Sequence, residues 1–216
     1  MTTPSNLLNL SRMHLGCGSI IADDFINVDG SFPGIKEVID EGRVYAVDGK
    51  PNTFILKHDL RNGIPSKPKS LDVIYHSHFL EHLTREESLI FLKNCENHLK
   101  PGGHMRVVVP DFQLWCQNYI DKKVEFFEWY KSTYLGKDNP MYKTTASVFT
   151  GMLYNHGHQM AYDFDALESL LKDCGFTDIR KSTWGHSEKI PDINKVENSN
   201  PRRFESLLIE CEVKVT

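Results

Sequence analysis

The sequence lacks the features that mark several classes of protein. It has no apolar run approaching the ~20 residues that cross a bilayer, and Met1 to Leu10 contains no basic segment followed by a long apolar stretch, as a signal peptide would. Lysine and arginine are nowhere clustered, and 29 acidic against 25 basic residues give a net charge of -4. We therefore expect neither a nucleic-acid partner nor a membrane partner.

The cysteines are too few and too scattered to form a framework. They are odd in number and contain no C-x-x-C pair: Cys17, Cys95, Cys116, Cys174 and Cys211. This argues against a disulfide scaffold or a cysteine-based zinc site and fits a reduced cytoplasmic location. No repeat or low-complexity tract divides the 216 residues, so we expect a single domain over residues 1–216, as a monomer or homodimer.

Short apolar segments alternate with polar loops and helical periodicity, which predicts an α/β domain with a largely parallel sheet. The expected strands are Met13–Leu15, Phe25–Val28, Thr53–Leu56, Leu71–Tyr75, Met105–Val109, Phe176–Ile179 and Ser206–Cys211. Ligands of such sheets bind beyond the carboxyl ends of the strands. The residues that follow the first five strands should therefore converge at one edge: Gly16, Gly18, Asp29, Asp59, His76, Ser77, His78 and Asp111.

Two helices carry recognisable start and stop signals. Thr84 and Glu87 have the spacing of a capping box, and Pro101-Gly102-Gly103 is expected to end that helix. A second helix is expected from Asp165 to Cys174, with Asp165 and Glu168 as its capping box.

The segment from Phe112 to Gly157 interrupts this alternation. It holds eight of the 23 aromatic residues of the chain within 23 positions, from Phe112 to Tyr134. One interpretation is a helical hairpin whose aromatics pack on the sheet. The other is a lid, residues 112–157, that lines an acceptor pocket. The two interpretations are compatible.

The turn Leu15-Gly16-Cys17-Gly18 is the strongest chemical signal. Glycines after a strand let the backbone approach a ligand closely and expose N–H groups to it. A dinucleotide loop would place a third glycine at Ile21, and the Lys-Ser/Thr of a phosphate-binding loop is missing. Asp29 and Asp59, at the ends of the next two predicted strands, are suited to hydrogen bonds with a ribose diol and an adenine amino group.

Together these stretches resemble the class I S-adenosylmethionine-dependent methyltransferases, most closely a small bacterial group with a Leu-Gly-Cys-Gly turn. The matching segments are residues 15–18, 26–29, 72–75, 80–83, 99–103, 106–111, 170–171 and 175–176. The resemblance implies a Rossmann-like, mostly parallel seven-stranded sheet with one antiparallel strand and helices on both faces. The segment at 112–157 would then be a helical insertion after the fifth strand.

The resemblance also implies a cofactor, S-adenosylmethionine, and a site for it. Gly16 and Gly18 would pass under its methionyl part, Asp29 would hold the ribose, and Asp59 with Leu60 would frame the adenine. The remaining predicted cofactor contacts are His14, Cys17, His76 and Ser77. The sequence departs from the family at His14, which replaces an acidic residue, and at Ile20, which replaces a glycine.

Such an enzyme must hold an acceptor in line with the S–CH₃ bond, exclude water and remove a proton where the acceptor carries one. His78 is our first candidate base and His158 the second, because histidines commonly titrate near neutrality. Asp111 and Tyr162 are weaker candidates for that role, and with Trp115 and Tyr119 they make up the predicted acceptor site. We expect O-methylation of a small molecule, natural product or sugar. N-methylation of an amine or peptide is the alternative, and a non-catalytic cofactor-binding module is a third.

A competing motif overlaps this site. His78-Phe79-Leu80-Glu81-His82 matches H-x-x-E-H, a zinc-hydrolase pattern in which two histidines share a helix face. It accounts for none of the other motifs, and His156-Gly157-His158 is typical of a polar loop. We therefore expect no metal site.

Overall fold

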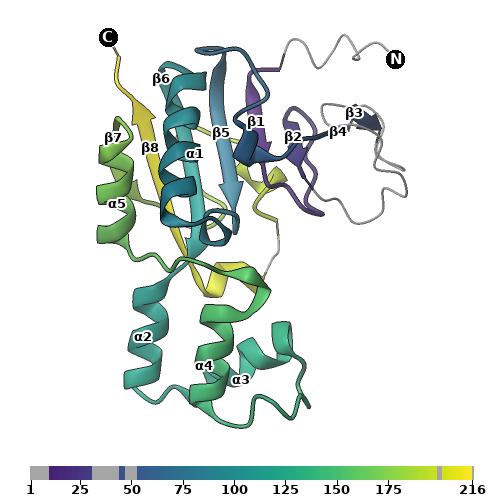
Figure 1. Ribbon diagram of the computed structural model, residues 1–216, viewed down its shortest axis with the longest axis vertical. Helices are drawn as coiled ribbons and strands as arrows, with labels where there is room; N and C mark the ends of the chain where they lie inside the picture. Colours follow the sequence, from purple (N-terminus) through teal and green to yellow (C-terminus); the bar gives the residue numbers. More distant parts are fainter. Residues whose placement is uncertain (1–9, 31–43, 47–52, 199–200, 216) are drawn as a thin grey trace.

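The computed structural model describes residues 10–30, 44–46, 53–198 and 201–215, which form an eight-stranded sheet with helices packed on it (Figure 1). The expectation about a signal peptide concerns Met1 to Leu10, of which residues 1–9 lie outside this range. Across the sheet the order is β3-β4-β2-β1-β5-β6-β8-β7. The bounds are β1 (Arg12–Leu15), β2 (Ile26–Asp29), β3 (Val44–Ala46), β4 (Phe54–Lys57), β5 (Leu71–Ser77), β6 (Leu99–Pro110), β7 (Phe176–Lys181) and β8 (Ser206–Val213).

The predicted Rossmann-like, mostly parallel sheet is confirmed. Strands β4, β2, β1, β5 and β6 are parallel, and β8 runs antiparallel between β6 and β7. The three-residue β3, which the sequence does not predict, pairs antiparallel with β4 as an eighth strand. Central strands are covered on both faces, so they appear in the sequence as continuous apolar runs such as Val107–Val109, which is fully buried.

One predicted helix boundary is correct and two need correction. Helix α1 (Arg85–His98) begins with the predicted capping box, in which Thr84 and Glu87 each bond the other's backbone N–H. It ends at His98, before Pro101-Gly102-Gly103, because these residues already belong to β6. Helix α5 (Phe164–Asp173) is capped by Asp163, which accepts from the Ala166 amide at 2.9 Å. Asp165 lies inside its first turn, since this register packs Phe164 against the core.

The two faces of the sheet are covered differently. Helices α1 and α5 lie on the face toward the viewer in Figure 1 and pack on the largest core cluster, which includes Leu92 and Leu171. On the other face, Phe25 and the segment containing Ile190, Ile193 and Val196 pack on β5, β6 and β8. Among the described helices, none is long and apolar enough to cross a membrane.

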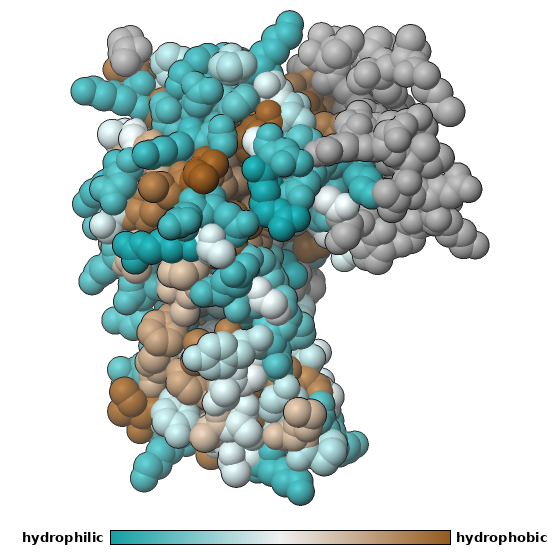
Figure 2. Space-filling model, viewed as in Figure 1, coloured by the Kyte–Doolittle hydropathy of each residue, from teal (hydrophilic) through white to brown (hydrophobic). Residues whose placement is uncertain are grey.

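The segment after β6 is helical and has a core of its own. It contains α2 (Phe112–Ile120), α3 (Val124–Tyr130), a π-helical turn (Lys131–Leu135) and α4 (Thr145–Tyr154). Its aromatics pack mainly on one another, for example Trp115 on Tyr130 with ring centroids 5.4 Å apart. Figure 1 shows α2, α3 and α4 beyond the carboxyl ends of β5 and β6. In Figure 2 weakly polar and apolar side chains gather on this part of the surface.

Candidate active site

A cleft of about 740 Å³ opens at the carboxyl ends of the strands, where the sequence predicts convergence. Its lining contains most of the predicted cofactor residues: Gly16, Cys17, Gly18, Asp29, Asp59, Leu60, Ser77 and also His78. It contains further residues that the sequence did not indicate, namely Ser19, Ile20, Gly30, Arg61, Phe79, His82, Leu83, Glu87, Gln159 and Arg202.

The glycine turn after β1 forms one wall of this cleft. Gly16 and Gly18 have φ of 62° and 52°, a left-handed conformation that glycine adopts without strain. A Cβ on Gly16 would lie 2.8 Å from the Phe79 ring, whereas a Cβ on Gly18 would meet nothing within 4 Å. The turn thus leaves open space for a ligand at Gly18. Cys17 contributes mainly backbone, because its buried side chain packs with Ile21 and Ile55.

Two carboxylates stand at the ends of neighbouring strands. Oδ2 of Asp29 accepts a hydrogen bond from the Gly18 amide at 2.8 Å. Asp59 caps the 3₁₀ turn η2 (Leu60–Asn62) and binds the Arg61 guanidinium, with Oδ2 2.6 Å from Nη2. These hydrogen bonds from Arg61 lower the pKa of Asp59. The sequence does not single out Arg61, because its pairing with Asp59 depends on the 3₁₀ turn between them.

His14 and His76, predicted to face the cofactor, lie in the interior instead. His14 is 2 % exposed and His76 is 0 % exposed, and burial lowers the pKa of each to about 3. The His14 ring packs edge-on against Tyr75, with centroids 5.0 Å apart. Both residues precede the last position of their strands, so their side chains project onto the faces of the sheet. The edge is reached by Ser77, which ends β5, and by His78.

A second cavity, of about 200 Å³, lies between this cleft and the helical insertion. It shares three residues with the cleft: His78, His82 and Arg202. The rest of its lining comprises Glu81, Pro110, Trp115, Tyr130, Tyr134, His156, His158 and Glu205. We call this cavity the inner pocket.

The two candidate bases, His78 and His158, do not fit the expectation of titration near neutrality. Burial lowers the pKa of His78 well below its usual range and that of His158 to about 4. Burial also raises the pKa of Glu81 to about 8 and that of Glu205 to about 7. Desolvation disfavours whichever form is charged, so it shifts acids and bases in opposite directions.

The H-x-x-E-H segment does not form the helix that a zinc hydrolase needs. His78 has φ of 50°, and only Leu80–His82 (η3) is helical, as a single 3₁₀ turn. His78 bonds Ser206 Oγ through Nε2 at 2.7 Å, and its Nδ1 is 3.5 Å from Glu81 Oε1. The two histidines of the motif therefore do not share one helix face.

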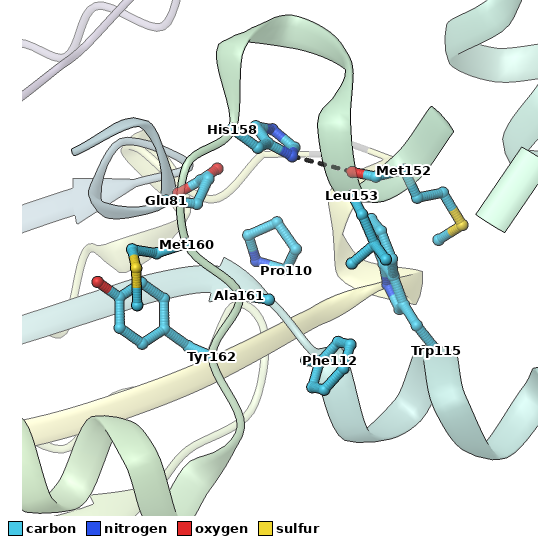
Figure 3. A pocket seen from close by; sticks show the side chains of 10 residues that line it. All are labelled: Glu81, Pro110, Phe112, Trp115, Met152, Leu153, His158, Met160, Ala161 and Tyr162. Atoms are coloured by element: carbon cyan, nitrogen blue, oxygen red, sulfur yellow. Dashed lines mark hydrogen bonds between the residues drawn. The ribbon is translucent and has the colours of Figure 1, made fainter. Parts of the chain in front are cut away.

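The predicted acceptor residues do not all lie at one cavity. Trp115 lines the inner pocket and donates to the Glu205 carbonyl at 3.3 Å. Tyr162 is buried, its hydroxyl 3.0 Å from Ser88 Oγ. Tyr162 lines the smaller pocket drawn in Figure 3, which adjoins the inner pocket. Asp111 caps α2 by accepting from the Leu114 amide at 3.1 Å. Tyr119 is 41 % exposed and stacks on Phe149, outside both cavities.

Comparison with known proteins gives one matching family and many solved structures of similar fold. The model of a methyltransferase domain family matches residues 15–181. A SAM-dependent methyltransferase from Archaeoglobus fulgidus is 18 % identical, with 96 % of this chain and 89 % of that one aligned at a TM-score of 0.52. Another from Thermotoga maritima is 15 % identical over 94 % and 82 %, with a TM-score of 0.50. These two likenesses establish the fold. No curated protein matches the sequence at a significant level.

Proposed function

The chain belongs to the methyltransferase domain family and is an S-adenosylmethionine-dependent methyltransferase; we propose that it O-methylates a small, single-ring acceptor bound in the inner pocket. The observation that carries this proposal is that the pocket shares His78, His82 and Arg202 with the large cleft. A methyl donor in the cleft and an acceptor in the pocket would meet at these residues.

The large cleft fits the cofactor. It combines a glycine turn with open space at Gly18 and a strand-end carboxylate at Asp29. We propose that Gly16, Cys17 and Gly18 hold the methionyl part through backbone, Asp29 the ribose, and Asp59 with Leu60 the adenine. When bound, S-adenosylmethionine supplies an electrophilic methyl group on a sulfonium sulfur.

The inner pocket fits a small acceptor. Its volume of about 200 Å³ is below the roughly 300–1,000 Å³ of drug-sized sites. Trp115, Tyr130 and Tyr134 offer aromatic faces on the side of the insertion, and Glu205 and Arg202 offer polar groups. We propose that residues 112–157 serve as the lid and acceptor-binding region, which closes the pocket against water.

His78 is our proposed proton acceptor. Its imidazole lines both cavities and is neutral at neutral pH, so it carries a lone pair. In the proposed transfer the acceptor oxygen forms a bond to the methyl carbon while the C–S bond breaks toward sulfur. The hydroxyl proton passes to His78, and S-adenosylhomocysteine leaves. The hydroxyl proton becomes strongly acidic once the oxygen is alkylated. A weak base can therefore remove it when proton transfer follows formation of the C–O bond.

A second candidate, N-methylation, is favoured by one observation. Glu81 and Glu205 bring two buried carboxyl groups to a pocket that also has aromatic walls. This combination suits a cationic amine, through charge pairing and cation–π contact.

The first test is calorimetric titration with S-adenosylhomocysteine, which requires no knowledge of the acceptor. We expect micromolar binding by the wild type and binding about 100-fold weaker in Asp29→Ala. Folded wild-type protein that does not bind this compound would overturn the proposed function.

The second test measures transfer of a labelled methyl group from S-adenosylmethionine to matched phenols, monosaccharides and amines. Turnover of hydroxyl acceptors alone supports O-methylation, and turnover of amines alone overturns it. His78→Asn, which suits the positive φ, should lower the rate about 100-fold. It should retain S-adenosylhomocysteine binding.

A further inference from the structure

The side chain of Glu81 is one of the buried polar groups in the described part of the chain that have no hydrogen-bond partner. Glu81 is 1 % exposed, and neither of its side-chain oxygens has a hydrogen-bond partner among the described residues. Buried carboxylates are almost always partnered, because desolvation without compensation is costly. A cation bound beside Glu81 would supply the missing partner.

Three imidazoles lie near this carboxyl group: His78, whose Nδ1 is 3.5 Å from Glu81 Oε1, and His82 and His158, which come from separate segments and group with it. His82 Nε2 lies 3.9 Å from Glu81 Oε1, and one ligand atom each from Glu81, His82 and His158 lie within 4.8 Å of one another. The rings of His82 and His158 meet edge to face, with centroids 4.9 Å apart.

The tautomer of His158 follows from its other nitrogen. Nδ1 lies 2.9 Å from the Met152 carbonyl oxygen, which can only accept, so Nδ1 carries the proton (Figure 3). Nε2 is left with a lone pair. In Figure 3 the His158 ring stands beside the Glu81 carboxylate. Histidines that bind metal ions are typically oriented in this way by a carbonyl on the far nitrogen.

The two segments are fixed to each other through the main chain. The amides of Gln159 and Met160 both donate to the Glu81 carbonyl, at 2.8 and 3.1 Å. The Gln159 side chain donates to the His82 carbonyl at 2.8 Å. The three side chains are thus held together before any ligand binds.

We propose that Glu81, His82 and His158 bind a divalent transition-metal ion of the kind that takes imidazole and carboxylate ligands, such as Zn²⁺. Two atoms that each lie about 2.1 Å from one zinc ion are at most about 4.2 Å apart. The 3.9 Å pair meets this limit, and small side-chain rotations bring in the third ligand. Three protein ligands leave a position open, as in catalytic zinc sites.

The site differs from the one that the H-x-x-E-H motif indicates. It keeps Glu81 and His82 and takes His158, from the loop after α4, as its third member. His78 is outside this group: its Nε2 bonds Ser206 Oγ, and only its Nδ1, 3.5 Å from Glu81 Oε1, faces the site. The remaining charged groups of the inner pocket are Arg202 and Glu205, which are opposite in sign.

The location suggests what the ion does, and this part rests on the proposed function. All three ligands line the inner pocket, and His82 also lines the cofactor cleft. A Lewis acid here lowers the pKa of an acceptor hydroxyl that reaches its open side. That effect would compensate for the weak basicity of the buried His78.

The test uses tag-free, full-length protein that has been stripped with a chelator and titrated at neutral pH. Zn²⁺ binding is followed by calorimetry and Co²⁺ binding by visible absorption. We expect one ion per chain with micromolar or tighter affinity. Glu81→Gln and His158→Gln should each weaken binding by about 100-fold or more. Loss of an outer-sphere partner typically weakens metal binding about 10- to 100-fold, and loss of a direct ligand should cost at least as much. His186→Gln, which changes an exposed histidine, should bind as the wild type does.

Millimolar or sub-stoichiometric binding by the wild type, or equal binding by Glu81→Gln and the wild type, would overturn the inference. Circular dichroism of each variant shows that it is folded. S-adenosylhomocysteine titration of the same samples separates the two proposals, because Glu81 does not line the cofactor cleft. Normal cofactor-product binding without metal binding overturns only the metal site, and the reverse result overturns only the proposed function.

Discussion

The main-chain amide of Gly18 donates a hydrogen bond to Oδ2 of Asp29 at 2.8 Å. This contact joins the turn after β1 to the end of β2, eleven residues further along the chain. Asp29 therefore has a structural role in shaping the turn as well as the proposed role in binding ribose.

Variants of Asp29 separate these two roles. Asn retains an oxygen that can accept from Gly18 but loses the charge, whereas Ala loses both. Because charge-assisted hydrogen bonds contribute about 1.5–3 kcal/mol, we expect Asp29→Asn to weaken S-adenosylhomocysteine binding about 10-fold and Asp29→Ala about 100-fold. Calorimetric titration measures both. Equal affinities of Asp29→Asn and the wild type would show that the charge is not used.

The two glycines of the turn provide a matched pair of variants. Alanine at either position adds the strain of a positive φ, of about 1 kcal/mol. Only at Gly16 does the new Cβ also meet the Phe79 ring, at 2.8 Å. We expect urea denaturation to show a loss of about 1 kcal/mol for Gly18→Ala and about 2–3 kcal/mol for Gly16→Ala. A larger loss at Gly18 would contradict this geometry.

Glu205 should make the protein less stable as the pH rises. Burial raises its pKa from 4.5 to about 7. The folded state therefore favours the neutral acid, and stability falls between pH 4.5 and 7. We expect Glu205→Gln, which stays neutral, to match the wild type below pH 4.5 and to exceed it by about 2–3 kcal/mol above pH 7. Urea denaturation across this pH range is the measurement, and a constant difference would contradict it.

Glu210 should have the opposite effect. It is desolvated, which raises its pKa, but His104, Ser187 and the fully buried Arg106, whose Nη1 is 2.8 Å away, outweigh this and lower the pKa to about 2. Its contribution is present above pH 4.5 and is lost as the pH falls toward 2.

We therefore expect Glu210→Gln to cost about 2 kcal/mol at neutral pH, because solvent reaches the neighbouring Arg180 and screens part of the interaction. The difference from the wild type should shrink as the pH drops below 4.5. A difference that stays constant below pH 4.5 would show that folding does not lower the pKa of Glu210.

The sequence by itself determined the features that depend on local geometry. The glycine turn after β1 and the Thr84–Glu87 capping box are recognisable because each acts within a few residues of its own position. The carboxylates of Asp29 and Asp59 are recognisable because each stands where an apolar strand ends. Parallel strands bring their carboxyl ends to one edge, so these local signals also predicted the large cleft.

Only the tertiary structure decided which polar groups are buried and what charge they carry. His14 and His76 were misplaced because strand side chains alternate between faces, and packing selects the face. Ser206 reaches His78 across 128 positions of sequence only because β8 returns beside β6. Arg202 and Glu205, in the segment just before β8, reach the inner pocket in the same way. The grouping of Glu81, His82 and His158 and their shifted pKa values arise from that folding, because desolvation is a property of the surroundings and not of the residue type.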